Sequence, residues 1–174
     1  FGSNISKQVF LLKNKPIFTY PLETFNNNKL IDKVVLVTDK NHFDEFYQYI
    51  RNNNMNKVSV VLGGSSRQES VKNGLDFFYE FEDDDIVIIH DAARPLIDDE
   101  IIENVIENTK KYGAVTTYLP VEDTTAVKNS TDFIEKIIDR KKLVKIQTPQ
   151  AFKLSLIKDA HKKATNYEAT DDCT

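Results

Sequence analysis

The chain has 174 residues, of which 40% are hydrophobic, and this is enough for one domain with a substantial core. Its 23 Lys and Arg residues stand against 27 Asp and Glu residues, and the net charge of −4 argues against a surface that holds a nucleic-acid backbone. The single cysteine excludes a disulfide framework and a thiolate zinc site, and the longest apolar run is far shorter than the roughly 20 residues that cross a bilayer.

Three short runs of Val, Ile and Leu predict strands that are buried on both faces of a parallel sheet. They are DKVVLVTD (32–39), NKVSVVLGG (56–64) and DDIVIIHD (84–91). Two helical patterns lie between and after the first two runs, HFDEFYQYIRN (42–52) and RQESVKNGLDFFYEF (67–81). The alternation of strands and helices predicts a three-layer α/β domain, and we expect one soluble, cytoplasmic domain over the whole chain.

The last third of the chain has a different pattern. Residues 114–129 and 132–152 are β-prone and carry alternating charges, and the turn-like KNST (128–131) separates them. This predicts a hairpin arm, at about 121–146, rather than another strand–helix unit. KLSLIKDAHKKAT (153–165) then has the spacing of an amphipathic helix.

The segment GGSSRQES (63–70) follows a predicted strand and opens a predicted helix. Gly63 and Gly64 allow another group to approach the backbone closely, and the first-turn amides of the helix can donate to an electronegative ligand. The alternative is an ordinary strand–helix turn with Ser65 or Ser66 as its N-cap. The segment is not a Walker A loop, since no Gly-Lys-Ser/Thr follows.

The segment HDAARP (90–95) lies where the third strand ends. Open α/β sheets bind ligands outside the carboxyl ends of their strands, so Asp91 and Arg94 are placed to face such a crevice. The alternative is an Asp–Arg pair that only ties down a loop. His90 has no His or Cys companion at ligand spacing, and we interpret it as structural rather than metal-binding.

Three cationic side chains, Lys7, Arg94 and Arg140, lie near predicted strand ends, and we find neither a Ser–His–Asp nor a Cys–His set. A lone Lys or Arg is usually a solvated surface charge. Together, however, these residues favour phosphate chemistry, in which catalysis is mostly positioning and charge neutralisation, over acyl transfer.

Six motifs in sequence order resemble the 2-C-methyl-D-erythritol 4-phosphate cytidylyltransferase family across nearly the whole chain. They are SKQVFLLKNKPIFTYPLETF, GGSSRQESVKNGL, IIHDAARPLI, PVEDTTAV, DRKKLVKIQTPQAF and TDD. The resemblance implies a Rossmann-like three-layer nucleotidyltransferase fold with a mostly parallel sheet, a protruding β-arm and homodimers formed through that arm. It also implies transfer of CMP from CTP to 2-C-methyl-D-erythritol 4-phosphate in non-mevalonate isoprenoid synthesis, with release of pyrophosphate. Mg²⁺, held mainly by the nucleotide phosphates, is the implied cofactor, with no protein ligand assigned to it.

The resemblance also assigns residues to the nucleotide. Lys7 matches a catalytic lysine that stabilises the transition state at the triphosphate, although Ser6 replaces the proline of the family's PKQ motif. Gly64, Ser65 and Ser70 match positions that contact cytosine, and Ser65 stands where an acidic residue can occur.

Two further matches lie near the ribose, namely Asp91 and Ala92, with Asp91 close to the metal-bound phosphates. The positions that match the pocket for the methylerythritol phosphate are Arg94, Thr124, Arg140, Thr148 and Thr170. Among them, Arg140 is expected to be catalytic, because its guanidinium fork can hold the substrate phosphate in line for attack on the α-phosphorus of CTP.

Parts of the family pattern are expected outside this sequence. The first strand and a Gly-rich loop that ends in arginine are expected before Phe1, and the lysine of an NIK motif after Thr174. The opening FGSNISKQ and the closing EATDDCT are typical of loop interiors, so we expect a longer chain and infer no targeting signal from this one.

Two alternatives to this function remain. A ribitol 5-phosphate cytidylyltransferase shares the fold, CTP and several motifs. A catalytically silent homologue would bind a nucleotide, or a protein partner, for regulation. The sequences DAARP and DRKKLVKIQTPQAF are more similar to the methylerythritol enzyme.

Overall fold

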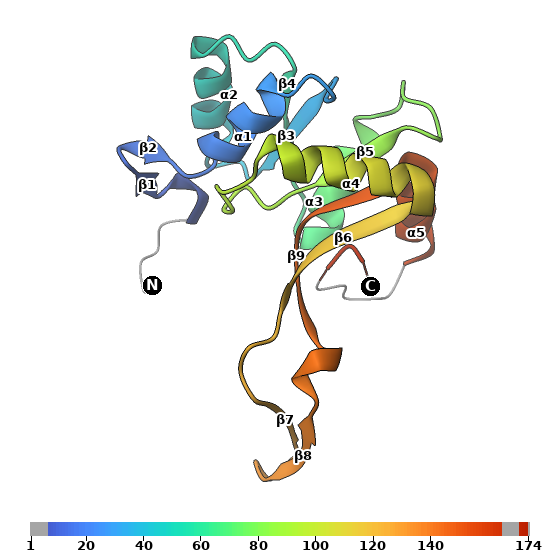
Figure 1. Ribbon diagram of the computed structural model, residues 1–174. Helices are drawn as coiled ribbons and strands as arrows, with labels where there is room; N and C mark the ends of the chain where they lie inside the picture. Colours follow the sequence, from blue (N-terminus) through green and yellow to red (C-terminus); the bar gives the residue numbers. More distant parts are fainter. Residues whose placement is uncertain (1–6, 165–170, 174) are drawn as a thin grey trace.

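Strands and helices alternate through the first part of the chain, as the sequence pattern predicts (Figure 1). The computed structural model describes residues 7–164 and 171–173. The helices are α1 (Thr19–Asn27), α2 (Phe43–Asn52), α3 (Arg67–Asp76), α4 (Asp99–Tyr112) and α5 (Leu154–Lys163), with short 3-10 helices η1 (Lys7–Val9) and η2 (Arg140–Lys142). The strands are β1 (Leu11–Leu12), β2 (Lys15–Pro16), β3 (Val34–Thr38), β4 (Val58–Leu62), β5 (Ile86–Ile89), β6 (Ala114–Pro120), β7 (Thr125–Lys128), β8 (Ile134–Ile138) and β9 (Val144–Lys153).

The three helices expected from the sequence are present, but α3 is shorter than its pattern. The prediction over 67–81 is wrong at its end, because α3 stops at Asp76 and the amides of Phe77 and Phe78 turn back to carbonyls three residues earlier. Phe78 then packs edge-on against Phe81, with ring centroids 5.3 Å apart. The aromatic side chains thus belong to a loop that folds back on the helix, and not to one helical face.

The strands form a mixed arrangement. β3 and β4 are parallel, in register from Val34 opposite Val58 to Thr38 opposite Leu62. β9 lies between β5 and β6 and runs antiparallel to both. Since β5 and β6 both oppose β9, they run in the same direction as each other. The α/β class is confirmed, and the expectation of a mostly parallel sheet needs one correction, which is the reversed strand β9.

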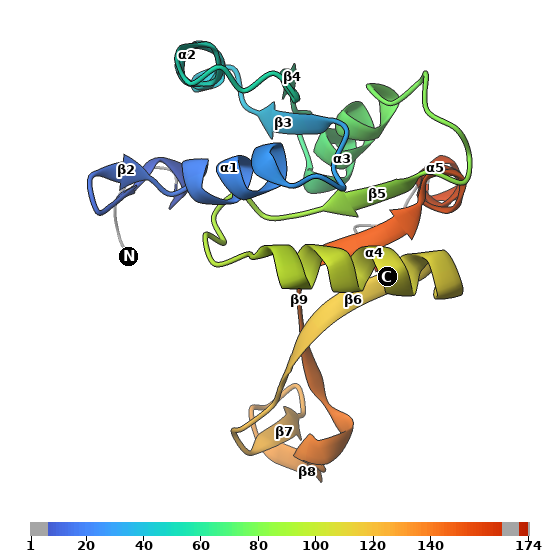
Figure 2. The same ribbon diagram turned by 45° about the horizontal axis from the view of Figure 1, so that its top comes forward.

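Helices cover both faces of this sheet (Figure 2). Successive side chains of a strand point to opposite faces. Ile86 and Ile88 of β5 accordingly pack with the α4 cluster, whereas Val87 and Ile89 pack with the cluster formed by α3 and α5. A third cluster joins α1 and α2 to β3 and β4 around the stacked rings of Phe18 and Phe46. None of the helices in the described ranges is both long and apolar enough to cross a membrane.

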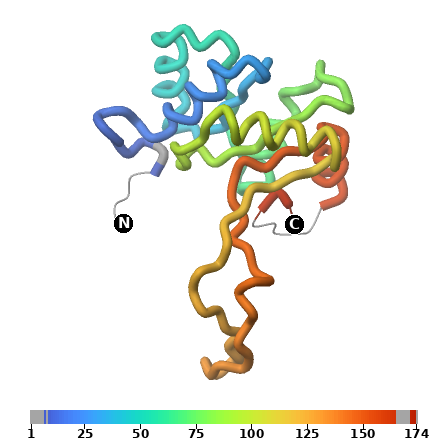
Figure 3. The backbone as a smooth tube through the Cα atoms, in the orientation of Figure 1, coloured from blue at the N-terminus to red at the C-terminus, as the bar shows by residue number. Residues whose placement is uncertain are grey.

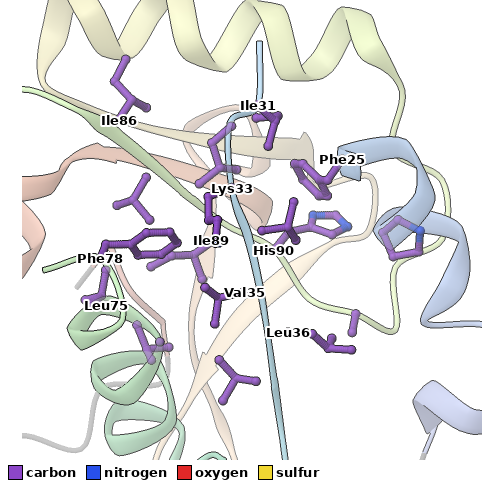
Figure 4. Close-up of a pocket in the computed structure, with 18 of the residues that line it drawn as sticks. Phe25, Ile31, Lys33, Val35, Leu36, Leu75, Phe78, Ile86, Ile89 and His90 are labelled. Carbon is purple, nitrogen blue, oxygen red and sulfur yellow. The ribbon is translucent and has the colours of Figure 1, made fainter. Parts of the chain in front are cut away.

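A cavity of about 670 Å³, lined by apolar side chains of β3 and β5 and by charged residues at their ends, separates β3 from β5. The side chains of both strands line it, and Figure 4 shows Val35 from β3 close to Ile89 from β5. In the described part of the chain, neither strand pairs with another strand on the side that faces this cavity. Both faces of β5 pack against helices, as predicted, but all four of its residues are half-buried because its edge toward β3 has no paired strand in the described part of the chain.

A hairpin extends beyond the ends of β6 and β9. β7 and β8 pair antiparallel from Thr125 opposite Ile138 to Lys128 opposite Ile134. Figures 1 and 3 show this hairpin projecting away from the layered body of the molecule. Its exposed large apolar side chains are Val127, Phe133, Ile134 and Ile137.

Candidate functional site

The turn between β4 and α3 is held by hydrogen bonds within the GGSSRQES segment. Ser66 is the N-cap, and its hydroxyl accepts from the amide of Glu69 at 3.1 Å. The carboxylate of Glu69 in turn accepts from the amide and hydroxyl of Ser65, both at 2.7 Å. The Ser70 hydroxyl accepts from the amide of Gly64 at 3.0 Å. Gly64, Ser65 and Ser70 therefore lie together in one tightly folded turn.

The turn requires glycine because side chains approach its backbone closely. A Cβ atom added at Gly64 would lie 2.1 Å from Cγ of Glu69, and one at Gly63 would lie 2.8 Å from Oγ of Ser70. The amide of Gly63 donates to the carbonyl of Thr38 at 2.8 Å, which ties the turn to the end of β3. The carboxyl ends of β3 and β4 therefore lie side by side at one end of the sheet, beside the start of α3. Electronegative ligands are readily bound at such a position.

Asp91 follows β5 at this edge and lies between two guanidinium groups. Nε of Arg94 donates to Oδ2 at 2.8 Å, and Nη1 of Arg67 donates to Oδ1 at 3.2 Å. Burial opposes ionisation of the carboxyl group, but the hydrogen bonds and charges of the two arginines outweigh it and hold the pKa of Asp91 below its usual value. Asp91 is therefore a carboxylate at neutral pH, with both oxygens engaged.

Arg94 extends this network toward β9. Its Nη1 donates to the side-chain carbonyl of Gln147, and its own carbonyl lies 3.0 Å from Nε2 of His90. Burial lowers the pKa of His90, so the ring is neutral at pH 7, and it packs edge-on against Phe25 with centroids 5.6 Å apart. These contacts support the interpretation of His90 as a structural residue.

Thr148 and Ala92 also lie at this edge. The amide of Asp91 donates to the hydroxyl of Thr148 at 3.2 Å, which joins the end of β5 to β9. Ala92 packs against the cluster of α1, α2, β3 and β4 and lines the cavity. The predicted residues that the structure brings to this edge are Gly64, Ser65, Ser70, Asp91, Ala92, Arg94 and Thr148.

The other predicted residues lie elsewhere. Thr124 and Arg140 are exposed residues of the hairpin region, where Nη1 of Arg140 donates to the carbonyl of Glu122. Lys7 is an exposed residue of η1. Thr170 lies outside the described residues. Within one chain, the two residues expected to hold the second substrate from the arm do not join the cluster around Asp91.

Sequence reasoning missed several residues of this network. Arg67 stands inside the quoted GGSSRQES segment but received no role, and Asp172 stands inside the TDD motif. The side chain of Gln150 is fully buried and donates from Nε2 to both carboxylate oxygens of Asp171, at 2.8 and 2.9 Å. The sequence did contain a signal for Arg67, which is a charged residue in the turn where a strand of the sheet ends and a helix begins. Its partner Asp172, however, lies 105 positions away in the sequence, so no local pattern could pair the two residues.

Comparisons with known proteins agree on one family. A family model described as 2-C-methyl-D-erythritol 4-phosphate cytidylyltransferase (IspD) matches residues 1–174. The protein of that name from Clostridium tetani is 41% identical over an alignment of 174 positions, which covers 98% of this chain and 70% of that protein. A ribitol-5-phosphate cytidylyltransferase from Lacticaseibacillus paracasei is 38% identical over 165 residues, or 94% of this chain and 70% of that protein. The crystal structure of 4-diphosphocytidyl-2C-methyl-D-erythritol synthase from Anaerococcus prevotii has a TM-score of 0.88 and 26% identity, with 99% of this chain and 75% of that chain covered.

Proposed function

The chain belongs to the 2-C-methyl-D-erythritol 4-phosphate cytidylyltransferase family, and we propose that the edge formed by the ends of β4 and β5 is where it binds CTP. It is a nucleotidyltransferase that moves CMP from CTP to 2-C-methyl-D-erythritol 4-phosphate and releases pyrophosphate. The observation that carries the placement of the site is Asp91, a carboxylate at a strand end that two arginines hold beside a helix N-terminus.

We propose that the reaction is an in-line attack by the phosphate oxygen of the second substrate on the α-phosphorus of CTP. Both reactants are anions, so cationic side chains must offset their repulsion. Lys7 neutralises charge on the triphosphate of CTP, whereas Arg94 and Arg140 bind the attacking phosphate of the second substrate. No general base is needed, because a phosphate monoester is already largely ionised near pH 7. The contribution of the protein is to align the two phosphates and to exclude other geometries.

We propose Gly64, Ser65 and Ser70 as the cytosine contacts and Asp91 with Ala92 as the ribose side of the nucleotide site. Thr148 and Thr170 complete the pocket for the second substrate. The internal hydrogen bonds of Ser65 and Ser70 support this use, because they fix each hydroxyl in one orientation before a ligand arrives.

The cofactor that we propose is Mg²⁺ held mainly by the phosphates of CTP. Among residues 7–164 and 171–173, no cluster of three His, Cys, Asp or Glu side chains could hold a metal ion by itself. Asp91 lies close to where the phosphates would hold the ion, but both of its oxygens already accept from arginines, which fits an ion whose ligands are mainly substrate oxygens. When bound, Mg²⁺ would neutralise charge on the triphosphate, and Asp91 would lie close to the metal-bound phosphates.

We propose further that the hairpin arm, residues 121–146, joins two copies of the chain and that each copy lends Thr124 and Arg140 to the site of the other. The support is twofold. Arg140 hydrogen-bonds within its own arm rather than in the Asp91 cluster, and the arm exposes Phe133, Ile134 and Ile137, which are 72%, 69% and 58% exposed.

This arrangement has a direct test in mixed dimers. If the arm of one copy completes the site of the other, Arg140→Ala protein and Asp91→Asn protein restore activity when they are mixed and allowed to exchange subunits. Half of the dimers would then be mixed, with one intact site of two, so about a quarter of wild-type activity is expected. A mixture that stays inactive although it contains mixed dimers overturns the shared site.

The cavity between β3 and β5 supports one more proposal, that the strand and Gly-rich loop expected upstream of Phe1 lie there. Figure 2 shows β3 and β5 pointing in the same direction, with open edges that face each other. In the described part of the chain, Oγ1 of Thr38 and Nδ1 of His90 are buried without hydrogen-bond partners, and both residues line this cavity. Slow amide exchange in both β3 and β5 of the complete natural protein is expected; exchange at the rate of open edges contradicts the proposal.

The test of the overall function is release of pyrophosphate from CTP, measured with each of the two alcohol phosphates. Turnover with 2-C-methyl-D-erythritol 4-phosphate and little with ribitol 5-phosphate is expected. Arg140→Ala should abolish turnover while the fold persists, with Arg140→Lys as the control that keeps the charge but loses the fork. Near-normal activity in Arg140→Ala contradicts the assignment, and turnover with neither substrate favours a silent homologue. The same resemblance supports the proposal of a cytoplasmic location.

A further inference from the structure

The proposed function uses Arg67 only as one of the two arginines that hold Asp91 and gives it no part in the reaction, yet it lies at the centre of the site. It is the first residue of α3, directly after the N-cap Ser66, and it lines the cavity at the ends of β3 and β5. Its Nη1 donates to Oδ1 of Asp91 at 3.2 Å, and its Nη2 donates to Oδ2 of Asp172 at 2.7 Å. One guanidinium group therefore joins the end of β5 to the chain segment 171–173.

The two carboxylates that Arg67 contacts differ in exposure, so its guanidinium group has one buried side and one side that faces the site. The side chain of Asp172 is 5% exposed, whereas that of Asp91 is 32% exposed and faces the site. A buried carboxylate is costly unless a cation pairs with it. Arg67 is consequently held from its buried side by Asp172 and presents its other arm to Asp91.

The segment around Asp172 is itself held by a second contact. Gln150, fully buried in β9, donates from Nε2 to the carboxylate of Asp171. The amide of Cys173 also donates to Oδ1 of Asp171, at 2.8 Å. The segment that contains Asp172 is therefore hydrogen-bonded to β9, which holds the Asp172 carboxylate in a fixed position beside Arg67.

The chain of contacts continues beyond Asp91. Its second oxygen accepts from Arg94, and Arg94 donates to Gln147 of β9. Each oxygen of Asp91 therefore has one arginine, Arg67 on the side of the proposed nucleotide site and Arg94 on the side of the second substrate. With one arginine removed, the carboxylate would be free to turn toward the other.

We propose that Arg67 is a positioning residue for the cytidylyltransferase reaction. One end of its guanidinium group donates to the Asp91 carboxylate and fixes its orientation, and the other end donates to Asp172. This inference rests on the proposed function, because the position of Asp91 matters only if Asp91 serves the nucleotide. The fork requires a planar group with two parallel donors, so lysine can replace the charge of Arg67 but cannot span both carboxylates.

The experiment compares Arg67→Gln, Arg67→Lys and Asp172→Asn in the complete natural protein. Steady-state kcat and KM are measured for both substrates, CTP binding is measured by calorimetry, and melting temperature reports folding. Lys72→Gln is the matched control, since Lys72 lies on the same helix and pairs at 2.8 Å with the exposed Asp76, away from the site. This control should leave all kinetic constants within about twofold.

Arg67→Gln is expected to lower kcat/KM for CTP by about 10-fold to 100-fold, as is typical when the support of an active-site ligand is lost. Arg67→Lys should lie between it and the wild type. Asp172→Asn should act in the same direction, and adding it to Arg67→Gln should cause little further loss, because the two residues act through one contact.

Two outcomes overturn the inference. One is a folded Arg67→Gln protein whose kcat/KM and CTP affinity lie within about twofold of the wild type; the other is additive losses for Arg67→Gln and Asp172→Asn. If Arg67→Gln fails to fold, Arg67→Lys and Asp172→Asn decide by the same criteria. A wild-type protein that turns over neither alcohol phosphate contradicts the proposed function instead, so the two failures are distinguishable.

Discussion

Replacing Asp91 by Asn removes a charge on which two arginines converge, while it keeps the shape of the side chain. In the wild type, Oδ2 accepts from Arg94 at 2.8 Å and Oδ1 accepts from Arg67 at 3.2 Å. Asn offers one carbonyl oxygen to two guanidinium groups, and its NH₂ group faces a cation. We therefore expect Asp91→Asn to destabilise the fold as well as to impair the reaction.

The size of the loss follows from burial. A hydrogen bond to a charged group contributes about 1.5–3 kcal/mol when it is buried, whereas an exposed ion pair contributes about 0–1 kcal/mol. With its side chain 32% exposed, Asp91 lies between these limits. The expected fall in the free energy of unfolding is about 1–2 kcal/mol, which for a chain of this size lowers the melting temperature by about 2–8 °C.

The pH dependence has a definite sign. Because the folded protein holds the pKa of Asp91 below its usual value of about 3.9, the stabilisation is complete above that value and is lost as pH falls through the folded pKa. Urea unfolding of wild type and Asp91→Asn should therefore differ equally at pH 7.5 and pH 5, and should converge below about pH 4.

The control for this experiment is Asp84→Asn, because the Asp84 side chain is 87% exposed and forms an exposed ion pair with Lys153. It should leave the unfolding curve unchanged. Equal stability of Asp91→Asn and wild type at neutral pH, or a difference that grows in acid, would refute the reasoning.

Three other predictions concern single elements of the fold. Ser66→Ala removes the N-cap of α3 and should cost about 1 kcal/mol in urea unfolding, and Ser66→Asp should keep most of it; equal losses would contradict a capping role. Ile102→Ala empties a fully buried site in α4 and should cost about 2–5 kcal/mol; a cost under 1 kcal/mol would mean that the site collapses around the gap. If the arm joins two copies as proposed, Phe133→Glu at its exposed turn should shift sedimentation from dimer to monomer, whereas Ser130→Glu at the same turn should not.

Much of the fold follows from local patterns. The α/β class, the strands β3, β4 and β5 and the helices α2 and α5 all lie where the sequence predicts them, since each pattern reflects the side on which a segment is buried. α4 received no prediction, although its start carries the signal of an N-cap. Asp98 accepts from the amide of Ile101 at 2.9 Å, and acidic residues fill the first turn.

The sequence by itself determined the family, the order of the motifs and the edge of the sheet at which polar residues gather. These depend on residue types at short spacing, which a linear pattern records. Only the tertiary structure decided that β9 runs against its neighbours, that β5 is half-buried beside a cavity, and that Arg67 joins Asp91 to Asp172. Each of these depends on which distant segments are packed together, and hydrophobic burial, being non-directional, specifies that a residue is buried but not its partner.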